Sequence, residues 1–322
     1  MKIRWNEIGA LEWERRIAAL TPGGAAPLQQ SWAYGAANAL IGGETLRAAV
    51  EIDGRPAALA QFTLRRIGVG GACFASWAIC QRGPIWLNGP EGAPLSEAEK
   101  TETYRALRAE APLGRRRAIF FSPNEETPSP GLIEAGLRRV MTGYGTAVID
   151  LDRDEQALRA AMHGKWRNRL TAAERSDLRL AASRPKPGRI DWLLDKDDAQ
   201  QKANGYQTLP RPFADAFQRA GDRQGERRSL RLLRADIGGN CAAAMLFLVH
   251  GAAATYFIGW SGSEGKKRSA HNALLWKAMR VLKSDGVRSL DLGGVDTERG
   301  AGIARFKLGS GARPLSLCGT YF

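Results

Sequence analysis

One order of expected elements occurs twice in the 322 residues: three strands, one helix and a closing strand. Each strand is predicted from a run of apolar, β-branched or aromatic residues, and turns containing glycine separate consecutive runs. In the first half the elements are expected at residues 46–52, 56–67, 72–80, 95–111 and 117–122. In the second half they are expected at residues 229–237, 241–250, 254–260, 269–285 and 288–294. A repeated unit of this kind restricts the chain to two similar halves.

The expected elements also predict the fold class. Antiparallel hairpins that lead into one helix and a further strand form an α+β fold, with mixed sheets flanked by helices. Ser96 is placed to cap the first of the two helices, and Gly286 follows the second, as glycine often does at helix ends. Because the two halves join near residue 150, we expect two domains, 1–152 and 153–322.

The charge balance limits the kind of partner. The chain has 47 lysines and arginines against 33 aspartates and glutamates, which is a formal net charge of +14. Its hydrophobic fraction of 44% is that of a globular protein and not of a disordered one. An excess of positive charge this large favours a polyanionic partner, such as a nucleic acid, an anionic membrane or a phosphorylated substrate.

Cysteine and histidine form no metal-binding pattern in the sequence. The residues of these two types are widely spaced and include no C-x-x-C pair: Cys73, Cys80, Cys241, Cys318, His163, His250 and His271. We therefore expect buried, reduced thiols, structural or surface histidines, and no bound metal.

One long segment requires a test for membrane insertion. Residues 237–263 carry no charged side chain and are long enough to span a bilayer. His250 and Gly251 divide this segment into two runs rich in strand formers, which predicts a buried hairpin. The first twenty residues have scattered charges and no apolar core, unlike a signal peptide. A cytoplasmic protein is expected.

Residues 162–180 are expected to form a helix with a strongly basic start. Trp166, Leu170 and Ala173 form its apolar side. The polar residues near its start are Lys165, Arg167, Asn168 and Arg169. Forked guanidinium groups beside an amide suit a phosphate or diphosphate group. The alternative is an ordinary amphipathic helix with a solvated charged face.

The segment at 299–314, RGAGIARFKLGSGARP, places one Phe-Lys pair between two groups of small residues. Glycine lets the backbone approach a ligand closely, and Lys307 could then reach an oxygen that carries negative charge. The alternative is a flexible surface loop that contains an exposed lysine.

Several motifs in this chain occur together in one known family. They are LQQSWAYGAANAL from residue 28, RGP at 82–84, KWRNRLTAAER at 165–175, HNALLWKAM at 271–279, DLGG at 291–294 and RFKLGSG at 305–311. In this order they resemble the FemABX family, the aminoacyl-tRNA-dependent peptidyltransferases that build peptidoglycan interpeptide bridges. The resemblance implies two tandem GNAT-like (acetyltransferase-like) domains, in agreement with the repeat.

The resemblance also implies a reaction and its residues. An amine would attack the ester carbonyl of an aminoacyl-tRNA without ATP, and Lys307 would stabilise the negative charge that develops on the carbonyl oxygen. Arg167, with Lys165 and Arg169 beside it, would contact phosphates of the acceptor. The other residues expected to bind substrate are Asn168, Trp32, Tyr34, Tyr256, Asn272, Asp291, Phe306, Gly309 and Gly311.

The implied partners are aminoacyl-tRNA as co-substrate and an amine-bearing acceptor that can itself be phosphorylated. Peripheral contact with an anionic membrane, a monomeric state and no separate cofactor complete the expectation. This chain departs from the family in two respects. No cation follows Trp32 and Ala33 within residues 34–38, and no heptad pattern marks the helical insertion that many members carry.

Two other functions remain open. RGAGIA at 299–304 fits the R-x-x-G-x-A phosphate loop of acyl-CoA N-acyltransferases, which would make CoA the donor. A non-enzymatic nucleic-acid binder would use the positive charge, but it would leave the Phe-Lys segment without a role.

Overall fold

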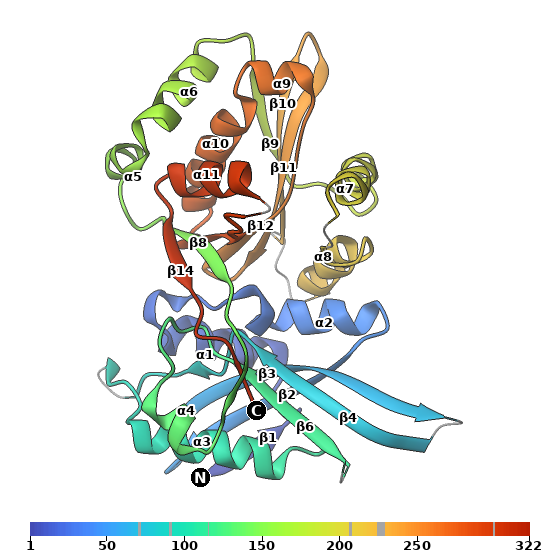
Figure 1. Ribbon diagram of the computed structural model, residues 1–322, viewed down its shortest axis with the longest axis vertical. Coiled ribbons are helices and arrows are strands. Elements are labelled where there is room, and N and C mark those ends of the chain that lie inside the picture. Colours follow the sequence, from blue (N-terminus) through green and yellow to red (C-terminus); the bar gives the residue numbers. More distant parts are fainter. Residues whose placement is uncertain (70–71, 90–91, 115, 206–207, 224–228, 299) are drawn as a thin grey trace. The chain divides into compact units, whose positions relative to one another are not determined.

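The chain forms two compact units in the computed structural model (Figure 1). One unit comprises Met1–Tyr144 with Ser316–Phe322, and the other comprises Gly145–Leu315. The structure describes all residues except 70–71, 90–91, 115, 206–207, 224–228 and 299, and except the side chains of 69, 72–74 and 204. The turn between the expected strands 56–67 and 72–80 therefore lies partly outside the described residues. Arg299, the first residue of RGAGIA at 299–304, also lies outside them.

These units differ from the predicted domains, 1–152 and 153–322, at both ends. Strand β8 (Gly145–Asp150) belongs to the second unit, because it pairs with β13 (Ser289–Gly294). The C-terminal strand β15 (Thr320–Tyr321) belongs to the first unit, because Tyr321 pairs with Phe121 of β6 (Arg117–Ser122). Long-range backbone pairing decides both assignments, and no local sequence pattern reports it.

The first unit contains an eight-stranded sheet in the order β1, β2, β3, β4, β6, β15, β7, with β5 paired to β3. Its remaining strands are β1 (Lys2–Trp5), β2 (Glu44–Ile52), β3 (Arg55–Val69), β4 (Ala72–Gln81), β5 (Ile85–Trp86) and β7 (Arg139–Met141). Its helices are α1 (Ala10–Leu20), α2 (Trp32–Leu40), α3 (Glu97–Glu110) and α4 (Pro130–Glu134), with short 3-10 turns at Pro22–Gly24 and Leu28–Gln30.

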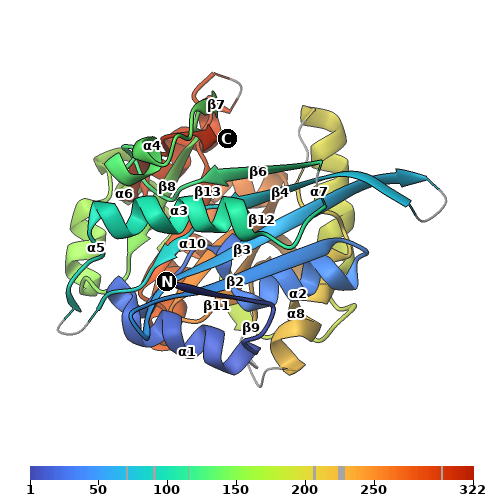
Figure 2. The same cartoon turned by 90° about the horizontal axis from the view of Figure 1, so that it is seen from below.

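Strand β2 shows how this unit is layered. Ala48 and Val50 belong to the apolar cluster that contains Tyr104 of α3, whereas Ala49 belongs to the cluster that contains Trp13 of α1. Alternate residues of a strand point to opposite faces, so α3 and α1 cover the two faces of the sheet. Figure 2 shows both helices against the strands.

The second unit contains a seven-stranded sheet in the order β14, β8, β13, β12, β11, β10, β9. Its remaining strands are β9 (Arg179–Ser183), β10 (Leu230–Ile237), β11 (Asn240–His250), β12 (Ala253–Ser261) and β14 (Arg313–Ser316). Its helices are α5 (Glu155–Ala161), α6 (Gly164–Glu174), α7 (Asp191–Asn204), α8 (Phe213–Arg223), α9 (Ser263–Lys267), α10 (Ala270–Ser284) and α11 (Ala301–Gly309).

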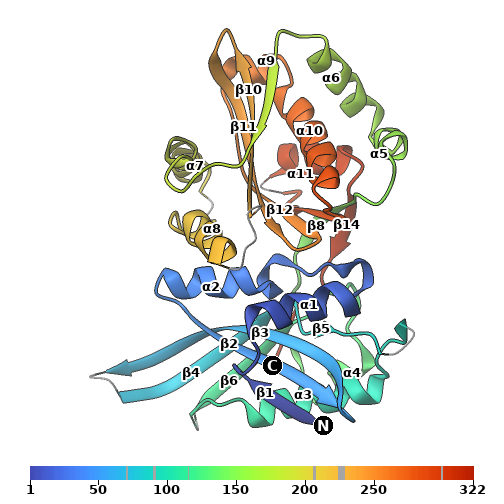
Figure 3. The same cartoon turned by 180° about the vertical axis from the view of Figure 1, so that it is seen from behind.

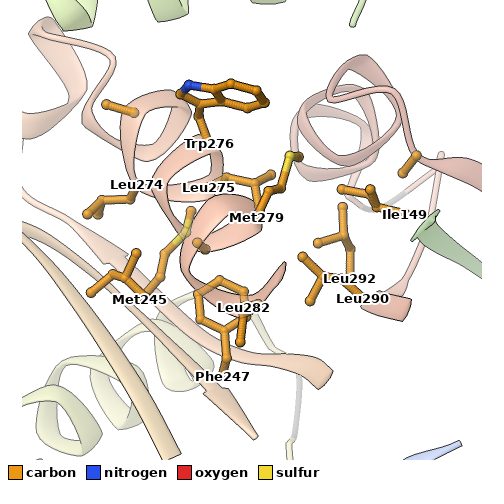
Figure 4. Packing of buried hydrophobic residues seen from close by; sticks show 14 of the residues in the cluster. Ile149, Met245, Phe247, Leu274, Leu275, Trp276, Met279, Leu282, Leu290 and Leu292 are labelled. Carbon is orange, nitrogen blue, oxygen red and sulfur yellow. The ribbon is translucent and has the colours of Figure 1, made fainter. Parts of the chain in front are cut away.

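Helix α10 forms the centre of the second unit's core. Leu275 and Met279 of this helix pack in one buried cluster with Met245 and Phe247 of β11 (Figure 4). Helices α7 and α8 lie on the opposite face of the sheet, as Figure 3 shows. Packed helices on both sides explain why β11 is buried along almost its whole length.

The predicted repeat is confirmed. In the first unit β2, β3 and β4 are joined as antiparallel neighbours, and β6 then returns parallel to β4 after α3. In the second unit β10, β11 and β12 are antiparallel neighbours, and β13 returns parallel to β12 after α10. A helix between two strands permits the crossover that parallel pairing requires. The fold is α+β with two mixed sheets flanked by helices, as expected.

The hairpin predicted within residues 237–263 is also confirmed, as β11 and β12. Among the described residues, no helix is both long enough and apolar enough to cross a membrane. Likewise, no group of three or more His, Cys, Asp or Glu residues in that part of the chain is arranged to hold a metal ion. Cys80 and Cys318 are buried free thiols, but Cys241 is only partly buried, and the side chain of Cys73 lies outside the description.

One local prediction was wrong, and one alternative is excluded. The basic helix was expected to continue to residue 180, but α6 ends at Glu174, and Arg179 pairs with Asp236 as part of β9. Strand pairing with β10 outweighs the helical pattern there. The alternative of a flexible surface loop around Lys307 does not hold, because α11 runs from Ala301 to Gly309.

Candidate functional site

Lys307 lies in the last turn of α11 and is buried, with 7% of its surface exposed. Its Nζ donates a hydrogen bond to the carbonyl oxygen of Gly294 at 2.7 Å. The lysine is therefore not a solvated surface residue, and the exposed-loop alternative is excluded. Burial of a lysine is rare unless a partner or a function compensates for the lost hydration.

The end of β13 forms one wall around this lysine. Asp291 Oδ1 accepts hydrogen bonds from Thr146 Oγ1 at 2.6 Å and from the backbone N–H of Gly293 at 2.7 Å. Gly293 has a φ of 74°, and a Cβ atom there would lie 3.7 Å from Lys307 Nζ. Asp291 thus holds the left-handed turn that brings the backbone close to the lysine.

An aromatic ring forms another side of the site. Lys307 Nζ lies 5.9 Å from the ring centroid of Tyr256 on β12, a distance at which a cation is attracted to the face of a ring. Tyr256, Asp291 and Lys307 were predicted as site residues from distant parts of the sequence. The second unit brings all three together.

Burial lowers the pKa of Lys307 to about 8, and the negative charge of Asp291 opposes that shift. At neutral pH the side chain is therefore mainly the ammonium form, with its charge poorly hydrated. A poorly hydrated ammonium group gains more from a nearby oxyanion than one in water does. The site can therefore stabilise negative charge that develops on an oxygen atom.

Helix α6 fixes the position of α11. Trp166 Nε1 donates to the carbonyl oxygen of Phe306 at 3.0 Å, and the two rings lie 5.9 Å apart. A Cβ atom at Gly309 would lie 3.0 Å from Trp166 Cδ1, and one at Gly311 would lie 3.1 Å from Ala161. The predicted residues Phe306, Gly309 and Gly311 therefore serve the packing of α11 against α5 and α6.

The polar residues of α6 do not form one group. Lys165, Arg167, Asn168 and Arg169 are all exposed. Arg167 Nη1 donates to the carbonyl oxygen of Ala160, near the end of α5, at 3.1 Å. Arg169 instead lines a cavity together with Asn272 of α10. The structure thus separates the two arginines that the sequence suggested would act as a pair.

That cavity has a volume of about 380 Å³ and also involves Lys266, Ser269, Ala270 and His271. Sequence reasoning did not identify Lys266 or Ser269. The run GKKRS immediately before a helix was the available signal, because a helix N-terminus preceded by cations suits an anion. His271 Nε2 lies 3.0 Å from the carbonyl oxygen of Trp260, and burial lowers its pKa, which favours the neutral ring.

Trp32 and Tyr34 belong to the first unit. Tyr34 Oη donates to Gln81 Oε1 at 3.5 Å, and burial raises the pKa of this phenol. The guanidinium of Arg47 lies 3.7 Å from the centroid of the Trp32 ring, and burial lowers the pKa of Arg47 to about 10. The sequence has no cation within residues 34–38, but Arg47 of β2 places one beside Trp32. Sequence reasoning missed it because the contact joins a helix to a strand.

The comparisons with known proteins agree with this architecture. Residues 159–308 match the family described as acetyltransferase (GNAT) domain. A crystal structure of FemX superimposes with a TM-score of 0.78 at 14% identity, over 100% of this chain and 96% of that chain. The chain has the FemX fold. The predicted resemblance is thereby confirmed at the level of the fold.

Other solved structures resemble this chain less closely. One is the C-terminal domain of a putative lysylphosphatidylglycerol synthetase from Agrobacterium fabrum, with a TM-score of 0.53, 14% identity, and coverage of 97% of this chain and 92% of that chain. Another is a tandem GNAT protein from the clavulanic acid biosynthesis pathway, with a TM-score of 0.50, 14% identity, and coverage of 99% and 98%. None of the curated proteins matches this sequence.

Proposed function

We propose that this protein is an aminoacyltransferase. It would move an amino acid from aminoacyl-tRNA onto an amine of a cell-envelope precursor, a peptide or a related acceptor. The observation that carries the proposal is Lys307, a buried ammonium group beside Tyr256 and the Asp291 turn in a FemX-like fold. Aminoacyl-tRNA is made in the cytoplasm, so the protein would act there.

The proposed reaction assigns Lys307 one task. The acceptor nitrogen attacks the ester carbonyl, and negative charge develops on the carbonyl oxygen. When the tetrahedral intermediate collapses, the C–N bond remains and the bond to the ribose oxygen breaks. The proton lost by the amine balances the proton gained by the ribose. One N–H of Lys307 Nζ donates to the carbonyl oxygen of Gly294, and its other N–H groups would donate to the oxyanion.

A kinetic comparison of two variants tests this assignment. Lys307→Ala should reduce kcat by about 10² to 10³ with KM little changed, because an oxyanion donor acts mainly in the transition state. Lys307→Arg keeps the charge, but the guanidinium fork has a different reach from the ammonium group and should restore little activity. Turnover of Lys307→Ala at the wild-type rate would show that the lysine has only a structural role.

An acyl-CoA N-acyltransferase is the second candidate. The match of residues 159–308 to the GNAT domain family favours it. The tandem GNAT protein favours it too, because the description of that structure names AcCoA, there as the absent compound. With acyl-CoA the donor is a thioester, and Lys307 would stabilise the same kind of oxyanion. The two donors can be separated by melting temperature. CoA should stabilise the protein under one proposal, and aminoacyl-tRNA should stabilise it under the other.

A further inference from the structure

The hairpin of β3 and β4 in the first unit has an exposed face near its end. Leu64 of β3 and Ala78 of β4 belong to the apolar cluster that contains Tyr104 of α3. The residues next to them, Arg65 and Trp77, are paired directly across the two strands. Because alternate residues of a strand point to opposite faces, Arg65 and Trp77 lie on the face away from α3. Figure 2 shows this end of the hairpin reaching beyond α2 and α3.

Two large apolar side chains are exposed on this face. Ile67 follows Arg65 by two residues on β3, so it lies on the same face, and 53% of its surface is exposed. Trp77 is 39% exposed, although tryptophans in folded proteins are on average highly buried. A single exposed apolar residue needs no explanation, but here an aliphatic and an aromatic residue share one face with a cation. We call Arg65, Ile67 and Trp77 the hairpin face.

The hairpin is positively charged and has no acidic residue of its own. Residues 54–90 include no aspartate or glutamate. Arg66, on the opposite face of β3, pairs with Glu44 of β2 at 2.8 Å, but Arg65 has no ion-pair partner among the residues that the structure describes. Exposed Arg116 precedes β6, and its carbonyl oxygen accepts a hydrogen bond from the backbone of β4 at 3.0 Å. Positive charge therefore adjoins the exposed apolar side chains.

We propose that the hairpin face docks the protein on a membrane surface that contains anionic lipids. A tryptophan is favoured at the level of the lipid headgroups, an isoleucine beside it enters the boundary of the acyl chains, and arginines attract anionic headgroups. Lipid fits this face better than RNA does, because an isoleucine offers no flat ring on which a base could stack. The inference does not rest on the proposed function, since the hairpin belongs to the first unit and Lys307 to the second.

The test is sedimentation of the full chain with vesicles of two compositions: phosphatidylcholine alone, and equal parts of phosphatidylcholine and phosphatidylglycerol. The wild type should bind the anionic vesicles about tenfold or more tightly than the neutral ones, because each cation near an anionic surface contributes about fivefold in affinity. Raised salt should weaken this binding, since salt screens the attraction. No sedimentation with anionic vesicles at low salt, or equal binding to both compositions, would overturn the proposal.

Two matched pairs of variants at exposed positions locate the contact. Arg65→Ala should weaken binding about fivefold. Arg66→Ala removes the same charge from the opposite face, where Arg66 is paired with Glu44, and should stay within about twofold of the wild type. Ile67→Ser should weaken binding about threefold or more, because less apolar surface enters the interface. Its control is Leu11→Ser, at a side chain that is 85% exposed on α1, which should bind as the wild type does. Equal weakening within either pair would reject the hairpin face.

Fluorescence reports on Trp77 itself. Vesicles with brominated acyl chains quench a tryptophan that enters the bilayer, and Trp77→Phe should lose most of the quenching that the wild type shows. Quenching that persists in Trp77→Phe would show that another surface enters the lipid. Lys307→Ala should bind vesicles as the wild type does, which separates docking from the proposed reaction. If Arg65→Ala weakens the binding of a minihelix RNA and leaves vesicle binding unchanged, the hairpin face binds nucleic acid and the lipid proposal is rejected.

Discussion

At the scale of single residues, burial of the Lys307 charge lowers the stability of the folded protein, and the proposed role of that charge would explain this cost. Its folded pKa of about 8 is lowered by burial from an ordinary value near 10.5. Between these two pH values the unfolded chain holds a proton that the folded protein has lost, so this group makes stability rise with pH. Below about pH 8 the buried charge destabilises the fold, and the cost is relieved as pH increases.

The corresponding prediction concerns Lys307→Met, which removes the charge and keeps a chain of similar length. At pH 7 the variant should melt at a higher temperature than the wild type, and the difference should shrink as pH approaches 10. The carbonyl oxygen of Gly294, which loses its partner, belongs to an exposed residue and can bind water. Thermal melts of both proteins across this range provide the measurement. A wild type that is more stable at pH 7 would contradict the destabilising role.

At the scale of elements, the contact between α6 and α11 determines where Lys307 lies. Gly309 leaves room for Trp166, whose indole also bonds to the backbone of α11 at Phe306. A larger residue at 309 must displace either the indole or the helix, because its Cβ atom already lies 3.0 Å from Trp166 Cδ1. The position of the lysine thus depends on a side chain about 140 residues earlier in the sequence.

We expect Gly309→Val to lower the melting temperature and to reduce turnover about tenfold or more, because misplaced catalytic groups lose rate steeply. Gly302→Ala is the matched control on the same helix, since a Cβ atom there meets nothing within 4 Å. It should preserve turnover and add up to about 1 kcal/mol of stability through its helix propensity. Equal turnover in the two variants would show that the α6 contact does not position the site.

At the scale of the whole molecule, the net charge of +14 concerns recognition and not folding. If the partner is tRNA, its affinity should fall as salt concentration rises. Each phosphate that a lysine or arginine neutralises adds roughly 0.7–0.9 to the slope of log affinity against log salt. Filter binding or calorimetry between 50 mM and 200 mM salt, the range in which such binding typically falls about 10³-fold or more, would measure that slope.

Lys165→Ala should reduce the magnitude of this slope by the contribution of about one phosphate. The reason is that this exposed lysine of α6 has no ion-pair partner among the described residues and is available to a phosphate. Arg211→Ala is the control, since Arg211 is paired with Asp195 at 2.7 Å and with Asp198 at 2.9 Å. It should leave the slope unchanged. An affinity that does not change with salt would argue against a polyanionic partner altogether.

The repeat, the α+β class and the hairpin within 237–263 followed from the sequence by itself. Each depends on local patterns: apolar runs of strand length, glycine turns between them, and a helix of amphipathic residues such as α10. The Phe-Lys pair, the DLGG turn and the basic start of α6 were also recognisable, because they are contiguous in the chain. Local physics determines such features, and a sequence reports them directly.

Only the tertiary structure decided what those features do. Lys307 of α11 lies beside Gly294 of β13 and Tyr256 of β12. The basic helix ends at Glu174, because Arg179 pairs with β10 as part of the edge strand β9. The cavity combines Arg169, Lys266 and Asn272 from three helices. Burial, long-range strand pairing and the shape of a cavity depend on which distant segments meet. A chain read residue by residue carries no local signal of that.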